Sequence, residues 1–235
     1  MEDLIKERIR NGKAGLLREL PFLLLTLPVG VITVLGLFYP PVLASQGQAH
    51  RIFYTHVAIA WVALYAPLFA AVSGLLYLFT RKERFDVWSL ANTRLAFLFS
   101  IGVLISGMLW AKITWGTFWN WHDSRLISFF VLCLCLGGYF IVRYLTDHPR
   151  NRAVYSSLMA ILAAFAAVLT WYAIRLIKPD LHPTSVIGTM HPRIRAVFWL
   201  SILAYHFAFI VMLRVAVRQE YISRIRNRFS VKMEH

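Results

Sequence analysis

Six long apolar stretches constrain this chain more than any other feature of its sequence. None of them contains Asp, Glu, Lys or Arg. Each comes close to or exceeds the length of about 20 residues that an α-helix needs to cross a bilayer. Because backbone polar groups in lipid must be satisfied within the spanning segment, such stretches predict transmembrane helices. The stretches are Phe22–Tyr39, Phe53–Thr80, Leu95–Ala111, Leu126–Val142, Ala153–Ile174 and Ala196–Leu213.

The composition of the chain also favours a membrane protein. Of its 235 residues, 59% are hydrophobic and 15% are charged. Soluble domains are typically about 45–50% apolar and about 25% charged, so a soluble core could not hide this much apolar surface. We therefore expect an all-α integral membrane protein with six transmembrane helices. The single membrane domain covers residues 1–235, with spans near 21–43, 54–79, 91–112, 125–145, 153–175 and 196–217.

The positions of the basic residues predict the orientation of these helices. The net charge is +14, but the Lys and Arg residues flank the apolar stretches, which is typical of membrane topology and not of a nucleic-acid-binding surface. With the N-terminus in the cytoplasm, the inner segments hold 17 Lys and Arg residues and the outer segments hold 7. We therefore expect both termini in the cytoplasm, lipid as a partner, and no nucleic acid.

The expected outer segment around residues 113–124 has an unusual density of aromatic residues. Three Trp and one Phe fall within seven residues, between Trp115 and Trp121. An aromatic belt at the membrane interface is one interpretation. A flat apolar shelf for a large planar ligand is the other, because aromatic rings make stacking and edge contacts. The residues of such a shelf would be Trp115, Gly116, Trp119 and Trp121, with Asp123 and Arg125 beside them.

Histidine residues also gather in the expected outer segments. A lone His near a membrane surface is usually an interface residue, but several on one side favour a ligand role. Neutral imidazole is a usual axial ligand of haem iron, and two His residues from separate segments can hold the iron from both faces. Outer Arg residues suit either lipid headgroups or the propionates of a haem. The outer His residues are His50, His56, His122, His182 and His191.

Other features narrow the possible chemistry. Cys133 and Cys135 lie in an apolar stretch, and the chain has no CxxCH motif for covalent haem attachment. It has no Walker A motif, so it does not hydrolyse ATP by that machinery. His206 lies in the middle of the sixth stretch, where an ionisable group is a candidate functional residue.

These residues together resemble the cytochrome c maturation protein C family, a group of haem-handling membrane proteins with a tryptophan-rich "WWD" motif. The similarity covers most of the chain. In the family, an acidic residue directly follows the third Trp of the motif, whereas here His122 separates Trp121 from Asp123. The roles of His122 and Asp123 therefore stay open. The matching segments are the six spans, Arg51–His56 with Trp61, Trp115–Trp121, Asp123–Leu126 and the last outer segment with His182.

The resemblance implies that haem b binds non-covalently to the Trp shelf, on the outer face of the cell inner membrane. It implies that His56 and His182 are the axial ligands of the iron. It also implies delivery of the haem to a periplasmic haem chaperone, together with an ABC-type ATPase and further membrane subunits. Such a chain presents haem and is not clearly an enzyme. Two alternatives stay open: a direct haem lyase of the larger cytochrome c synthetase type, and a channel or transporter subunit without haem.

Overall fold

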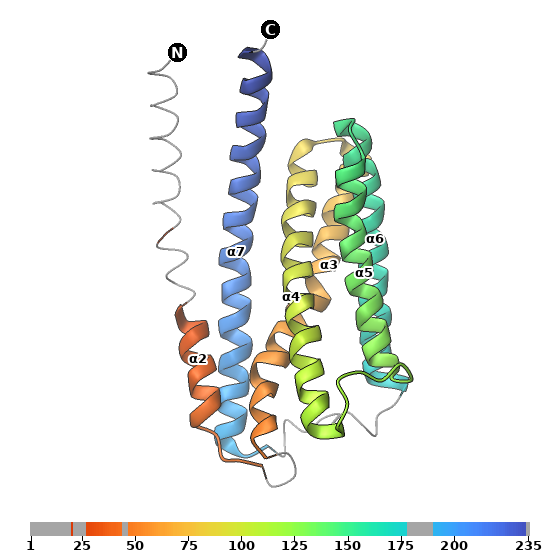
Figure 1. The fold of residues 1–235 in the computed structure, drawn as a ribbon. Helices are drawn as coiled ribbons and strands as arrows, with labels where there is room; N and C mark the ends of the chain where they lie inside the picture. Colours follow the sequence, from red (N-terminus) through yellow and green to blue (C-terminus); the bar gives the residue numbers. More distant parts are fainter. Residues whose placement is uncertain (1–19, 21–26, 44–46, 178–189, 234–235) are drawn as a thin grey trace.

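The computed structural model describes residues 20, 27–43, 47–177 and 190–233, and this part of the chain is helical (Figure 1). Among these residues the only β-type pairing is an isolated bridge between Leu43 and Gly47. The helices are α2 (Leu27–Phe38), the 3-10 turn η1 (Gln48–Arg51), α3 (Ile52–Thr80), α4 (Glu83–Trp115), α5 (Ser124–Leu145), α6 (Pro149–Tyr172), the π-helical turn η2 (Ala173–Ile177) and α7 (Pro192–Met233).

Five of the described helices are long and apolar enough to cross a membrane: α3, α4, α5, α6 and α7. Helix α2 is shorter, with 12 residues, and residues 21–26 before it lie outside the described part. The expectation of a multi-pass, all-α membrane protein is therefore confirmed. Six spans and cytoplasmic termini remain predictions.

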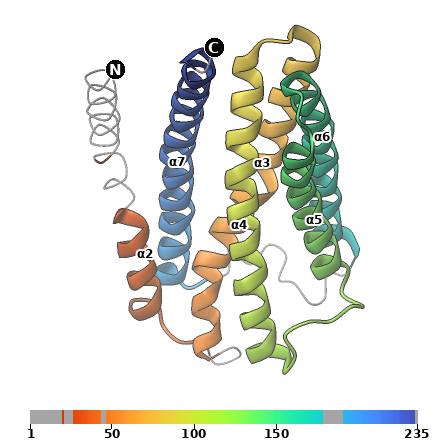
Figure 2. The same cartoon turned by 45° about the horizontal axis from the view of Figure 1, so that its top comes forward.

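The helices run up and down in a bundle around α3, which packs against α4, α6 and α7 (Figures 1 and 2). The loop between α4 and α5 lies at the same end of the bundle as the starts of α3 and α7. We call this the loop end. The α3–α4 and α5–α6 connections lie at the opposite end. The described parts of the segments that the sequence assigns to the outer face therefore lie at one end of the bundle (Figures 1 and 2).

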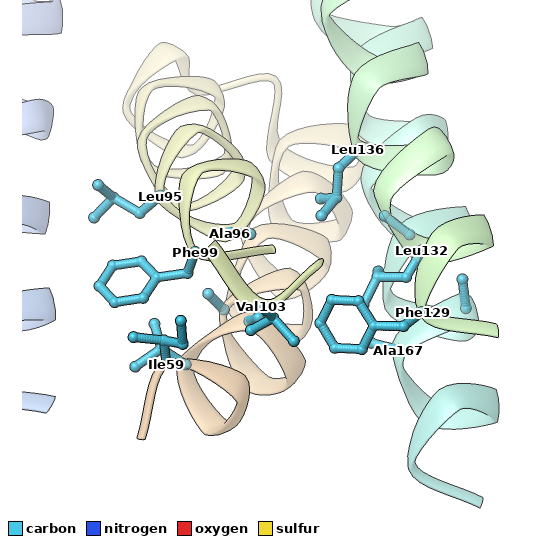
Figure 3. Close-up of a cluster of buried hydrophobic side chains, with 14 of the residues drawn as sticks. Ile59, Leu95, Ala96, Phe99, Val103, Phe129, Leu132, Leu136 and Ala167 are labelled. Atoms are coloured by element: carbon cyan, nitrogen blue, oxygen red, sulfur yellow. The ribbon is translucent and has the colours of Figure 1, made fainter. Parts of the chain in front are cut away.

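Small residues allow α3 and α6 to approach closely. A Cβ atom at Gly74 of α3 would lie 3.2 Å from the Cα atom of Ser157 of α6. Fully buried alanines, among them Ala160 and Ala163, line the α6 side of this contact. Lipid is as apolar as a Leu side chain, so membrane helices associate largely through such close packing. A larger apolar cluster joins α4 to α5 through Val103 and Leu132 (Figure 3).

The connection between α3 and α4 is shorter than the sequence indicated. The expected spans near 54–79 and 91–112 left residues 80–90 as the connection between them, but α4 already begins at Glu83. Only Arg81 and Lys82 form the connection, and Arg81 takes the left-handed conformation with a φ of 56°. The charged residues at the start of α4 were placed in the connection because the local sequence does not show their ion pairs with other helices. Those ion pairs hold them in the helix.

Asp86 is the centre of those ion pairs. Its side chain is 5% exposed, and it accepts hydrogen bonds from Arg143 of α5 at 2.7 Å and from Arg224 of α7 at 2.5 Å. Arg224 also contacts Glu220, one turn earlier in α7, at 2.9 Å. This network ties α4, α5 and α7 together at the end of the bundle opposite the loop end.

Candidate functional site

The Trp-rich segment begins where α4 ends. The backbone of Gly116 is left-handed, with a φ of 76°, and its N–H donates to the carbonyl of Lys112 at 3.0 Å. This conformation ends the helix and costs little only for glycine, since a Cβ atom would strain it. Gly116 therefore turns the chain sharply from α4 into the loop that holds Trp119 and Trp121.

The aromatic side chains of the Trp-rich segment form two groups. Trp115 packs against Trp110 of α4, with ring centroids 5.5 Å apart. Trp119 lies 5.4 Å from Trp121 and 5.8 Å from Phe130 of α5, both in edge-to-face contacts. Trp121 is 64% exposed, whereas Trp115 and Trp119 are half-buried. The segment therefore presents exposed and half-buried indole rings that are held in place by aromatic neighbours.

Sequence reasoning missed Trp110 and Phe130 as part of this arrangement. Both lie inside charge-free stretches, where an aromatic residue is ordinary. The only available signal was the helical position of Trp110, which lies five residues before Trp115. Their contribution depends on tertiary contacts that the sequence does not show.

Asp123 and Arg125 form a tight pair at the start of α5. Asp123 caps the helix: its Oδ1 atom accepts from the backbone N–H of Arg125 at 2.9 Å and from the Arg125 Nε at 3.0 Å. The two residues are 6% and 8% exposed. The guanidinium of Arg125 also lies 5.6 Å from the ring centroid of Trp115. This pair therefore joins the start of α5 to the Trp residue that ends α4.

The pairing sets the protonation state of Asp123. Burial disfavours the charged carboxylate, but the hydrogen bonds and the positive charge of Arg125 outweigh that effect. The pKa of Asp123 is therefore held below its usual range. Asp123 is a carboxylate at neutral pH, and its charge is directed at Arg125.

His122 occupies the turn just before this pair. Its side chain is exposed, and its backbone N–H donates to the Asn120 Oδ1 at 2.9 Å. The N–H of Asp123 donates to the carbonyl of Asn120 at 3.1 Å. These bonds form a local turn in which His122 lies between Trp121 and the helix cap.

His56 lies on α3, half-buried against α4. Its Nδ1 atom is 2.8 Å from the Oγ atom of Ser106. The contact residues on α4 precede Trp115 by about two turns, which places the imidazole about 12 Å along the helix axis from that Trp. His182, the other ligand expected from the sequence, lies outside the described residues. The structure therefore leaves the pairing of His56 with His182 a prediction.

The remaining His residues of interest have local backbone partners. The Nδ1 atom of His50 is 2.8 Å from the carbonyl of Gly47, and that side chain is buried. The Nδ1 atom of His206 is 2.7 Å from the carbonyl of Ile202. Over the described part of the chain, no three His, Cys, Asp or Glu residues gather as a site for a bare metal ion.

The comparison with known protein families identifies the group to which the chain is related. The family described as "Heme exporter protein C" matches residues 14–234. The chain belongs to the heme exporter protein C family. This confirms the resemblance that the Trp motif and the outer His residues indicated. A haem-related role in cytochrome c maturation, in a multi-pass membrane protein, follows from this membership.

Individual relatives agree with this assignment. The heme exporter protein C of Rhodobacter capsulatus is 29% identical over 201 residues, covering 83% of this chain and 82% of the relative. The heme exporter protein C of Paracoccus denitrificans is 28% identical over 197 residues, covering 80% and 81%. A putative cytochrome c biosynthesis ccmC-like mitochondrial protein of Marchantia polymorpha is 37% identical over 98 residues, 42% of each chain.

The chemistry of the loop end suits the planar, iron-bearing ligand that this family handles. The indole Nε1 atoms of Trp110 and Trp119 are buried, and neither has a hydrogen-bond partner within the described residues. Buried donors of this kind call for an acceptor such as a carboxylate. Haem supplies propionate oxygens, an apolar ring for the indole faces, and iron for an imidazole such as that of His56.

Proposed function

We propose that this chain holds haem b, without a covalent bond, at the loop end of its helix bundle. The haem is cargo on its way to cytochrome c. The observation that carries the proposal is the half-buried imidazole of His56. It is hydrogen-bonded to Ser106 of α4, on the same helix as Trp110 and Trp115. An imidazole held against α4 about 12 Å along the helix axis from Trp115 supplies the donor, and the indole rings supply the apolar surface, that a haem requires.

Each residue of the site then has a defined role. The shelf residues Trp115, Trp119 and Trp121 contact the haem ring, and the turn at Gly116 positions the segment that carries the last two. Asp123 and Arg125 order the shelf, because their ion pair joins the start of α5 to Trp115. His56 and His182 would hold the iron through their imidazole nitrogens. The iron supplies coordination and redox chemistry when haem is bound, and the protein binds and orients it.

The proposal extends to the cellular setting. Both termini lie in the cytoplasm, so the loop end faces outward from the cell inner membrane. There the chain passes its haem to a periplasmic haem chaperone. An ABC-type ATPase and further membrane subunits complete the assembly, since this chain has no Walker A motif of its own. The family name, an exporter of heme, supports a role as one subunit of such a transfer system.

A spectroscopic experiment on the purified chain tests this function. The protein in detergent should show a Soret band, and acid–acetone extraction should remove all of its haem. His56→Gly and His182→Gly should each weaken haem retention, and added imidazole should partly restore it. His122→Ala is the matched control, because that side chain is exposed in the neighbouring turn. Colour that resists extraction, or unchanged spectra in both Gly variants, would contradict the proposal.

A further inference from the structure

We propose that Ser106 and Gly107 of α4 are positioning residues for His56, which they hold in one tautomer and one orientation. This inference rests on the proposed function, because it gives the arrangement its purpose. It adds two residues that neither the sequence motif nor the aromatic cluster identifies.

The first step concerns the proton of the Ser106 hydroxyl. The Oγ atom of Ser106 lies 2.7 Å from the carbonyl oxygen of Gly102 and 3.2 Å from that of Val103. Carbonyl oxygens only accept hydrogen bonds, so the single hydroxyl proton is donated to Gly102. The Ser106 oxygen therefore meets its third neighbour, His56, with a lone pair.

The second step concerns the imidazole. The Nδ1 atom of His56 lies 2.8 Å from that same Ser106 oxygen. Since the oxygen offers a lone pair there, Nδ1 must carry the proton and donate it. In a neutral ring the other nitrogen, Nε2, then holds the lone pair that can ligate a metal. A hydrogen bond from the second ring nitrogen is how proteins generally set the tautomer and orientation of a ligating His.

The third step concerns the space that the ring occupies. A Cβ atom at Gly107 would lie 3.2 Å from the Cε1 atom of His56 and 3.9 Å from its Nδ1 atom. An alanine there would displace the ring by a few tenths of an ångström. Glycine at this position therefore lets the imidazole lie directly against α4, within reach of the Ser106 hydroxyl.

The chain offers matched controls for both positions on the same helix. Ser100 is fully buried and its hydroxyl oxygen has no hydrogen-bond partner within the described residues, so Ser100→Ala removes a hydroxyl group without affecting His56. A Cβ atom at Gly102 would also meet its nearest neighbour at 3.2 Å, but that neighbour is the end of the Ile59 side chain. Gly102→Ala therefore reproduces the crowding without touching the imidazole, and it keeps the backbone carbonyl that accepts from Ser106.

The first experiment measures the tautomer without haem. In haem-free protein with ¹⁵N-labelled His, nuclear magnetic resonance should find the proton of neutral His56 on Nδ1. Ser106→Ala should shift the population toward the Nε2–H form, whereas Ser106→Thr, which keeps a hydroxyl group, should preserve the wild-type signal. A wild-type protein with the proton on Nε2 would overturn the inference, whatever the protein does with haem.

The second experiment measures haem in the same variants. Ser106→Ala should weaken haem binding by roughly 10-fold or more, the usual effect of losing a partner of a ligating His. It should also raise the reduction potential, because the hydrogen bond makes the ligand more basic and favours oxidised iron. Gly107→Ala should weaken binding as well, while Ser106→Thr, Ser100→Ala and Gly102→Ala should match the wild type.

The outcomes separate this inference from the proposed function. If His56→Gly loses haem while Ser106→Ala keeps the wild-type affinity and potential, the positioning role is wrong and the haem site stands. If Ser106→Thr fails as badly as Ser106→Ala, a hydrogen bond is not the cause and the inference is again wrong. If His56→Gly keeps the wild-type spectrum, His56 is no ligand and both proposals fall.

Discussion

The buried carboxylate of Asp86 allows a quantitative prediction about how the bundle is held together. Asp86→Asn keeps the shape of the side chain and removes its charge. Two guanidinium groups, of Arg143 and Arg224, then lose their shared counter-ion. Arg224 keeps its contact with the Glu220 carboxylate at 2.9 Å, whereas the partners left to Arg143 within the described residues are uncharged: the new amide oxygen and the Tyr139 hydroxyl at 3.5 Å. The cost of the substitution should therefore come mainly from Arg143.

The magnitude follows from the burial of the groups. Removing one partner of a fully buried ion pair costs about 3–5 kcal/mol, because the other charge is left without compensation. The side chains of Arg143 and Arg224 are 14% and 19% exposed, so solvent recovers part of that cost. We expect Asp86→Asn to lower the free energy of unfolding by about 2–3 kcal/mol. Titration with sodium dodecyl sulfate in mixed micelles, followed by Trp fluorescence, measures this quantity.

Two further variants make this prediction refutable. Glu83 is 43% exposed where it contacts Arg224, so Glu83→Gln should cost no more than about 0.5 kcal/mol. The double variant Asp86→Asn with Arg143→Gln removes the uncompensated charge, so it should be more stable than Asp86→Asn alone. Equal effects of Asp86→Asn and Glu83→Gln, or a double variant that is less stable than the single one, would show that the reasoning is wrong.

Three other predictions address packing, acid stability and topology. Gly74→Val should force α3 from Ser157 and lower the free energy of unfolding by about 1–3 kcal/mol in the same titration, whereas Gly30→Ala, with no atom within 4 Å, should not destabilise the protein. The stabilising charge of Asp123 should persist above the usual Asp pKa of about 3.9 and be lost as the pH falls through its lower folded value. Trp fluorescence should therefore stay constant from pH 7 to about pH 4 and change below it, and Asp123→Asn should abolish that acid transition. Alkaline phosphatase should be inactive when fused at the C-terminus and active when fused in the 116–123 loop.

The sequence predicted the helices where composition alone determines them. The uncharged stretches within α3, α5, α6 and α7 are long enough to cross a bilayer, and such stretches must be helical in lipid. The sequence therefore predicted the middle parts of these helices. The start of α4 was not predictable in the same way. Asp86 meets Arg143 and Arg224 across more than fifty and more than one hundred residues of sequence, and no local pattern reveals that pairing.

The candidate site shows the same division between local and tertiary information. The segment from Trp115 to Trp121 was visible because its aromatic residues are neighbours in the chain. Ser106 was invisible, because a serine within a charge-free stretch has no distinctive signal until His56 of another helix lies 2.8 Å away. The partners of a candidate ligand residue come from helix packing, so they are the part of such a site that one sequence leaves out.

The Trp motif of this chain differs from the family motif at His122 and Asp123, and the structure distinguishes the two residues. The sequence left two possibilities, since either His122 or Asp123 could take the place of the acidic residue that follows the third Trp. The side chain of His122 is exposed in a turn, whereas Asp123 caps α5 and pairs with Arg125, whose guanidinium lies 5.6 Å from the ring centroid of Trp115. A carboxylate can cap a helix and pair with a guanidinium at once, and a neutral imidazole can do neither as well. We therefore infer that Asp123 takes the place of the acidic residue in the family motif, and that His122 is a spacer in the turn.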